Sequence, residues 1–124
     1  MAMKSEQVHA FLACTSRFER IMSEFPIEIR KGDVDAYEKH LESNRLRNDP
    51  KLTATAIRYF NLCSEEFFLH REDVIPDGVW EKWSLSIRHM FRAKWLRDKW
   101  QEVQNEYSSY PEFRQFMEGL IESL

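Results

Sequence analysis

With 124 residues, 43% of them hydrophobic, the chain is long enough for one hydrophobic core and too short for two, so we expect a single helical domain over residues 1–124. Only 3 Gly and 4 Pro occur, too few for the many tight turns of an all-β protein, and this favours an all-α fold. A formal net charge of -3 excludes a protein that binds polyanions over its whole surface, so any nucleic-acid role requires a local basic patch.

A first helix is predicted from Ser5 to about Phe25. Its apolar residues recur at intervals of three or four, which is the pattern of one buried helix face. These residues are Val8, Phe11, Thr15, Phe18, Met22 and Phe25. Pro26 disfavours helical geometry at the residue before it, so residues 26–32 are predicted to form a connector. The apolar pattern is too short for a confident coiled coil and indicates packing inside a bundle.

A short second helix is predicted next, with Asp33 or Asp35 as its cap, ending near Asn44. Asp49 and Pro50 then occupy the N-cap and first positions expected at the start of a third helix. This third helix carries an apolar stripe over about five turns, which predicts a central helix that is contacted on more than one side. The stripe contains Leu52, Ala56, Tyr59, Phe60, Cys63, Phe67 and His70.

The stretch from Asp73 to Tyr107 holds all four tryptophans and the densest run of positive charge. It opens with a turn in which Asp77 is expected to cap the next helix. Two apolar stripes follow that are out of phase with each other, so the helix must break near Arg92 to Lys94 to bury both. We therefore expect two helices that meet at an aromatic corner.

A last amphipathic helix is predicted at the end of the sequence. Ser109 and Glu112 have the spacing of a capping box, and Pro111 is tolerated in the first turn. The apolar stripe that follows contains Phe113, Phe116, Met117, Leu120, Ile121 and Leu124. The complete pattern predicts an all-α, single-domain bundle of five or six helices.

A set of motifs over residues 49–121 resembles an uncharacterised family of small bacterial helical proteins. In chain order the motifs are Asp49-Pro50, Ile57-Arg58-Tyr59-Phe60-Asn61, Glu65-Glu66, Phe68, Val74-Ile75-Pro76, Trp80-x-x-Trp83, Trp100, Tyr107 and Phe113-x-x-Phe116. Many members of that family carry N-terminal membrane helices, whereas this chain begins with an amphipathic helix. The resemblance implies a helical fold and supplies no activity.

The two cysteines, Cys14 and Cys63, each lie inside an apolar helical pattern, where a free thiol behaves as a small hydrophobic group. This usage is typical of a reducing compartment, so we expect a cytoplasmic protein. No segment has the eighteen or so consecutive apolar residues of a membrane span. We therefore expect neither a transmembrane helix nor secretion.

Few residues are spaced for catalysis or metal binding. Glu6 and His9 form an E-x-x-H pair, but carboxylate-bridged metal bundles need that motif twice. Cys14 and Cys63 lack the spacing of a zinc or redox site. We expect no catalytic residue, no cofactor and no metal site.

The densest polar cluster lies beside aromatic positions near the end of the third helix. Glu66 and His70 are one turn apart, and Arg58 or Arg88 is a candidate partner if a carboxylate enters the core. We interpret Glu66, His70 and Arg58 as a structural polar network between the third and fourth helices. The alternative is a bundle that binds a small ligand or a metal with Glu66 and His70.

The basic stretch is the remaining candidate for an interaction surface. It consists of Arg88, Arg92, Lys94, Trp95, Arg97 and Lys99. If Trp95, or the Phe11 and Phe18 face of the first helix, is exposed, that aromatic surface is suited to a protein partner or to a second copy of the chain, since Trp, Tyr and Arg often dominate interfaces. We therefore expect a non-catalytic protein-interaction or regulatory module. The alternative for the same face is nucleic acid, because basic residues contact phosphates and aromatic rings stack on bases.

Overall fold

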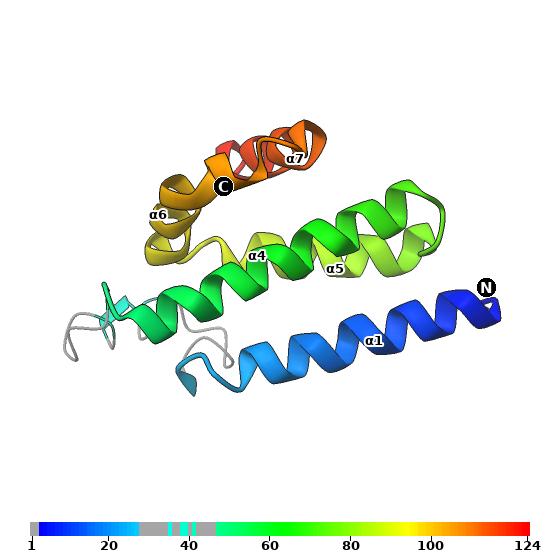
Figure 1. Cartoon of the computed structure of the whole chain (residues 1–124), viewed down its shortest axis with the longest axis horizontal. Helices are drawn as coiled ribbons and strands as arrows, with labels where there is room; N and C mark the ends of the chain where they lie inside the picture. The colour runs from blue at the N-terminus through cyan, green and yellow to red at the C-terminus, as the bar shows by residue number, and fades with distance from the viewer. Residues whose placement is uncertain (1–2, 28–34, 36–37, 40, 42–46) are drawn as a thin grey trace.

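The computed structural model describes residues 3–27, 35, 38–39, 41 and 47–124, and every structural statement below concerns these residues. They form five α-helices and one 3-10 helix, with no strand, so the expected all-α bundle is confirmed (Figure 1). The elements are α1 (Ser5–Met22), α4 (Pro50–Arg71), α5 (Asp77–Met90), α6 (Lys94–Val103), η1 (Gln104–Tyr107) and α7 (Pro111–Glu122). The second helix expected between Asp33 and Asn44 lies largely outside the described residues.

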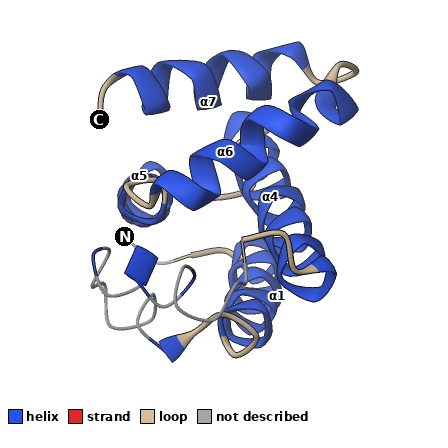
Figure 2. Cartoon of the chain, turned by 90° about the vertical axis from the view of Figure 1, so that its left-hand side faces the viewer, coloured by secondary structure: helices blue, strands red, loops and turns tan. Residues whose placement is uncertain are grey.

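The longest helix, α4, lies at the centre of the bundle, as its broad apolar stripe predicts. In Figure 1, α1 runs along one side of α4, and α6 and α7 lie on the opposite side. Figure 2 shows the same layers from the end of the molecule, with α5 beside α4. The start of α4 also matches the sequence: the Asp49 carboxylate accepts a hydrogen bond of 2.9 Å from the Leu52 amide, and Pro50 is the first helical residue.

The predicted break between the two tryptophan-rich helices is confirmed. α5 ends at Met90 and α6 begins at Lys94, and the intervening Phe91 and Ala93 are fully buried. At this corner the Phe60 ring packs against Phe91 and Trp100, with ring centroids 5.7 and 5.4 Å apart. The change of direction therefore buries both apolar stripes against the central helix.

Three helix termini differ from the sequence prediction. α1 ends at Met22, three residues before the predicted end at Phe25, which nevertheless stays buried in the following turn. Pro76, and not Asp77, occupies the cap position of α5, and the Asp77 carboxylate instead lies 2.8 Å from the His70 imidazole. Tyr110, and not Ser109, precedes α7.

Candidate functional site

The basic stretch between Arg88 and Lys99 does not form one continuous surface. Trp95 is 1% exposed and Lys99 is 5% exposed, so neither belongs to the interaction surface that the sequence suggested. The reason is the helical geometry of α6: Trp95, Leu96, Lys99 and Trp100 fall on one face, and that whole face is buried. The burial of Trp95 and Lys99 could have been predicted from the sequence. Each of them precedes a residue of the apolar stripe, Leu96 or Trp100, and a buried helix face includes such neighbouring positions.

Trp95 has a structural role instead. Its backbone amide donates to the Glu38 carboxylate at 2.8 Å, and its indole N–H donates to the Arg47 carbonyl at 2.8 Å. Glu38 and Arg47 also form an ion pair at 2.8 Å. The Lys99 ammonium group lies 5.7 Å from the centre of the Trp95 ring, as expected for a cation–π contact. These bonds tie the start of α6 to the segment before α4 and leave no indole face for a partner.

The remaining arginines line a surface groove between α5, α6 and the end of α7. The groove has a volume of about 710 Å³ and is lined by Leu85, Arg88, His89, Arg92, Arg97, Ile121 and Leu124. Leu85 is 60% exposed and Leu124 is 45% exposed, so apolar surface lies directly beside the guanidinium groups. Sequence reasoning missed Leu85, although its position outside the buried stripe of α5 was a readable signal.

The positive charge of the groove is not neutralised within the part of the chain that the structure describes. Arg88 donates to the hydroxyl and the carbonyl of Ser123, both at 2.7 Å. Arg97 donates to the carbonyls of Phe91 and Arg92, both at 2.9 Å. These acceptors are uncharged, and the Arg92 side chain makes no hydrogen bond or ion pair to a described residue. A partner with carboxylates would therefore meet three uncompensated cations.

Lys94, the remaining member of the basic stretch, lies outside this groove. Its ammonium group is 2.9 Å from the Asp98 carboxylate, one turn later on α6. Both side chains are well exposed, so this ion pair contributes little to stability but neutralises the local charge. The six predicted surface residues thus divide into three that line the groove, two that are buried and one that is paired elsewhere.

Glu66, His70 and Arg58 do not form the single polar network that the sequence suggested. Arg58 forms an ion pair with Glu24, in the turn that follows α1. His70 contacts the Asp77 carboxylate and stacks on the Trp80 ring at 5.3 Å, so it does connect α4 with α5, but without Glu66. Arg58, Glu66 and His70 all belong to α4, but the partners of Arg58 and His70 come from the turn after α1 and from α5.

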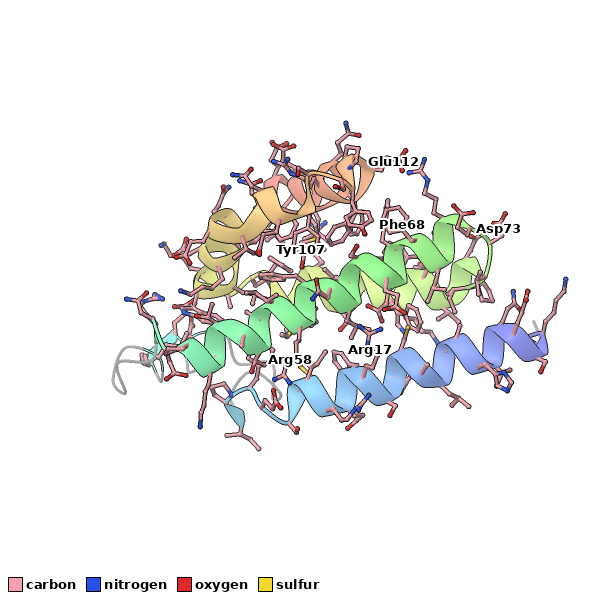
Figure 3. The ribbon with its side chains drawn as sticks, viewed as in Figure 1. Arg17, Arg58, Phe68, Asp73, Tyr107 and Glu112 are labelled. Atoms are coloured by element: carbon pink, nitrogen blue, oxygen red, sulfur yellow. The ribbon has the colours of Figure 1, made fainter. Side chains whose placement is uncertain are left out.

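Glu66 itself is buried, at 6% exposure, and faces α1. Burial raises the pKa of its carboxyl to about 8; the Arg17 guanidinium lowers this pKa and the neighbouring Glu65 carboxylate raises it. Figure 3 shows Arg17 and Arg58 at separate points of the interface between α1 and α4. Arg17 forms an ion pair with Glu65, so the nearest cation is already engaged with another carboxylate.

The two cysteines are free and buried, as the sequence predicts. Burial raises the pKa of Cys14 to about 11, with further contributions from Glu66 and Glu65. Burial also raises the pKa of Cys63 well above its usual value. Because the thiolate is the nucleophilic form, neither cysteine is suited to attack a substrate at neutral pH.

Among residues 3–27, 35, 38–39, 41 and 47–124, no group of three His, Cys, Asp or Glu side chains is arranged to hold a metal ion. No helix in the described part of the chain combines the length and the apolar character needed to span a bilayer. Comparisons with protein-family models, with curated proteins and with solved structures find no match for this chain. The resemblance to small bacterial helical proteins therefore stays a prediction.

Proposed function

We propose that this chain is a non-catalytic protein-interaction module whose groove between α5, α6 and α7 receives an acidic, amphipathic segment of a partner protein. The observation that supports the proposal is the combination of uncompensated arginines with exposed leucines in one groove. Carboxylates of the partner would pair with Arg88, Arg92 and Arg97, and its apolar side chains would cover Leu85 and Leu124. Such a mixture of apolar contact and arginine is typical of energetically dominant interface residues.

The charge of the groove also favours an acidic partner by contrast with the rest of the chain. The formal net charge is -3, so the three arginines form a local positive patch on an otherwise acidic molecule. This distribution would accelerate encounter with acidic segments and orient them toward the groove. We expect the interaction to take place in the cytoplasm, because Cys14 and Cys63 are both free.

A selection from a random peptide library displayed on phage tests this proposal. The purified chain is expected to enrich peptides in which Asp or Glu alternates with Leu, Ile or Phe at helical spacing. Synthetic versions of these peptides should bind about tenfold more weakly, or worse, to Leu85→Ser and Arg92→Glu variants, as measured by fluorescence anisotropy. Basic or neutral consensus peptides would contradict the proposal.

Matched controls separate the groove from the general surface. Leu12→Ser removes a leucine that is 56% exposed on α1, and Lys51→Glu reverses an exposed charge on α4. Both variants should bind the selected peptides as the wild type does. Equal losses in control and groove variants would show that the peptides bind elsewhere.

Nucleic acid and self-association are the competing occupants of the groove. A single-stranded oligonucleotide that binds with steep salt dependence, and that is lost in Arg92→Glu, would assign the groove to nucleic acid. A dimer in sedimentation experiments that dissociates in Leu85→Ser would assign it to a second copy of the chain. Either result would overturn the acidic-partner proposal. Trp95 is buried and cannot stack on a base, which weakens the case for nucleic acid on this face.

A further inference from the structure

A second cavity, separate from the basic groove, lies between α1, α4 and α5. It has a volume of about 280 Å³ and is lined by Phe11, Thr15, Phe18, Glu19, Tyr59, Glu66, Trp83, Ser86 and Ile87. Four of these residues are aromatic and come from three different helices. The Phe11 and Trp83 rings are nearly parallel, with centroids 6.0 Å apart. Thr15 and Glu19 are exposed, so the cavity has a polar rim that meets solvent.

Two polar groups in the walls of this cavity are poorly satisfied by the described residues. The Tyr59 side chain is 1% exposed, and its hydroxyl has no described neighbour to bond other than the Cys63 thiol. It lies near the Cys63 thiol, which is only a weak acceptor. The Glu66 carboxyl is 6% exposed and makes no hydrogen bond or ion pair to a described residue. Burying a poorly satisfied hydroxyl and desolvating a carboxyl are both unfavourable, so both groups would gain from a bound molecule that supplies further contacts.

The charges around the cavity indicate whether the bound molecule is a cation or an anion. Among the residues that the structure describes, its lining contains Glu19 and Glu66 and no Lys, Arg or His. Beyond the lining, Glu65 and the Cys14 thiol also lie near Glu66, and Arg17 is a nearby cation that forms an ion pair with Glu65. An anion would meet the Glu66 carboxyl and four aromatic rings, whereas a cation would be stabilised by the rings and by the ionised form of Glu66.

We propose that this cavity is a binding site for a small organic ammonium ion, with its charged head among the rings of Phe11, Phe18, Tyr59 and Trp83 and opposite the Glu66 carboxyl. Aromatic walls with a carboxylate are the recurrent chemistry for recognising methylated ammonium groups. The size is suitable, since a dry cavity of about 150 Å³ already accepts benzene. The proposal is independent of the peptide groove and involves none of its residues.

The burial of Glu66 gives this binding event a measurable proton balance. Burial raises the Glu66 pKa to about 8, so most molecules carry a neutral carboxyl at pH 7. A bound cation favours the carboxylate, and the carboxyl proton leaves to the buffer as the cation enters. Occupation of the cavity should therefore release up to one proton per ligand at neutral pH, and the affinity should rise as the pH increases toward the Glu66 pKa.

Isothermal titration calorimetry with choline tests the site. The matched probe is 3,3-dimethylbutan-1-ol, which has the same shape as choline without the charge. Choline is expected to bind about tenfold or more tightly than the alcohol. Titrations in phosphate and in Tris should differ in heat, because the released proton protonates buffers with different ionisation enthalpies. No binding of choline, or equal binding of the alcohol, would overturn the proposal.

Glu66→Gln keeps the shape of the side chain and removes its charge, so it should abolish the preference for choline and the dependence of the heat on the buffer. Glu81→Gln is the matched control, since Glu81 is exposed on α5 and does not line the cavity. This control should bind choline and release the proton as the wild type does. If Glu66→Gln retains both the preference and the proton release, the assignment of Glu66 to the site is wrong.

Discussion

The two sides of α4 are built from the same kinds of residue but are packed differently. On the side of α6 and α7, Phe60, Trp100 and Phe113 are at most 2% exposed, and the Tyr107 hydroxyl donates to the Asn61 side chain at 2.6 Å. Figure 3 shows Tyr107 and Phe68 in this layer, between α4 and the helices above it. On the side of α1, aromatic rings line a cavity, and the Tyr59 hydroxyl has no described neighbour to bond other than the Cys63 thiol. The side of α6 and α7 is tightly packed, whereas the side of α1 contains a cavity lined by poorly satisfied polar groups.

The contrast shows where the bundle can accommodate function. Filled aromatic packing with satisfied hydroxyls resists rearrangement, because each ring is fixed by several neighbours. A cavity with buried polar groups is less stable than the same volume filled by apolar side chains, and a ligand can recover part of that loss. The side of α1 is therefore the place where binding and stability should be coupled.

The largest expected effect comes from replacing one phenylalanine on each side of α4. Phe113→Ala removes a fully buried ring that packs against Trp100 and Tyr107, and it should lower the free energy of unfolding by about 3–5 kcal/mol. Phe18→Ala removes a partly buried ring beside an existing cavity and should cost about 1–2 kcal/mol. Urea denaturation followed by circular dichroism measures both. Equal losses would show that the two sides are packed alike.

The second test uses the pH dependence of stability. Glu66 has a folded-state pKa of about 8 against a reference value of 4.5, so between these values the folded state holds a proton that the unfolded state has lost. Stability is therefore greatest below the lower value and falls as the pH rises through about 8, by an amount on the order of a few kcal/mol. Denaturation curves from about pH 5 to about pH 9 should show this fall in the wild type.

Glu66→Gln should remove most of that pH dependence, because glutamine does not titrate. Glu81→Gln, at an exposed position, should retain it. A wild-type protein whose stability rises over the same pH interval would show that Glu66 is ionised in the folded state.

A smaller effect distinguishes the two buried hydroxyls. Tyr107→Phe removes a hydrogen bond to Asn61 and should cost about 1 kcal/mol. Tyr59→Phe removes a buried hydroxyl whose described neighbour is the weakly accepting Cys63 thiol, so it should be neutral or slightly stabilising. The same denaturation experiments compare the two variants. A larger loss for Tyr59→Phe would mean that its hydroxyl is satisfied, for example by a bound molecule.

The smallest effect concerns Arg17, which approaches Glu66 from α1. Its guanidinium lowers the Glu66 pKa, so Arg17→Gln should raise this pKa further. A carbon-detected NMR titration of the Glu66 carboxyl measures the change. Arg20→Gln, at an exposed position one turn later, is the control and should leave the titration unchanged. An unchanged Glu66 pKa in Arg17→Gln would exclude an electrostatic influence from α1.

The sequence alone determined the helical class, the start of α4 and the break between α5 and α6. These features are local: Asp49 and Pro50 satisfy the first turn of α4, and the phase change of the apolar stripe forces the corner near Arg92. Sequence also predicted that α4 is central, because only a helix contacted on several sides needs so broad an apolar surface. The caps at Asp77 and Ser109 were wrong: Pro76 and Tyr110 occupy the cap positions, and the Asp77 carboxylate contacts His70 of α4 instead.

Only the tertiary structure decided which polar residues meet. Arg58, His70 and Glu66 lie on one helix, but Glu24, Asp77 and the cavity beside α1 determine their surroundings. Helical spacing alone left open whether Trp95 is exposed, and in the folded chain Glu38 and Arg47 accept hydrogen bonds from both of its N–H groups. Helical periodicity specifies which face of a helix is apolar, whereas the partner of each face depends on contacts between segments that are distant in the sequence.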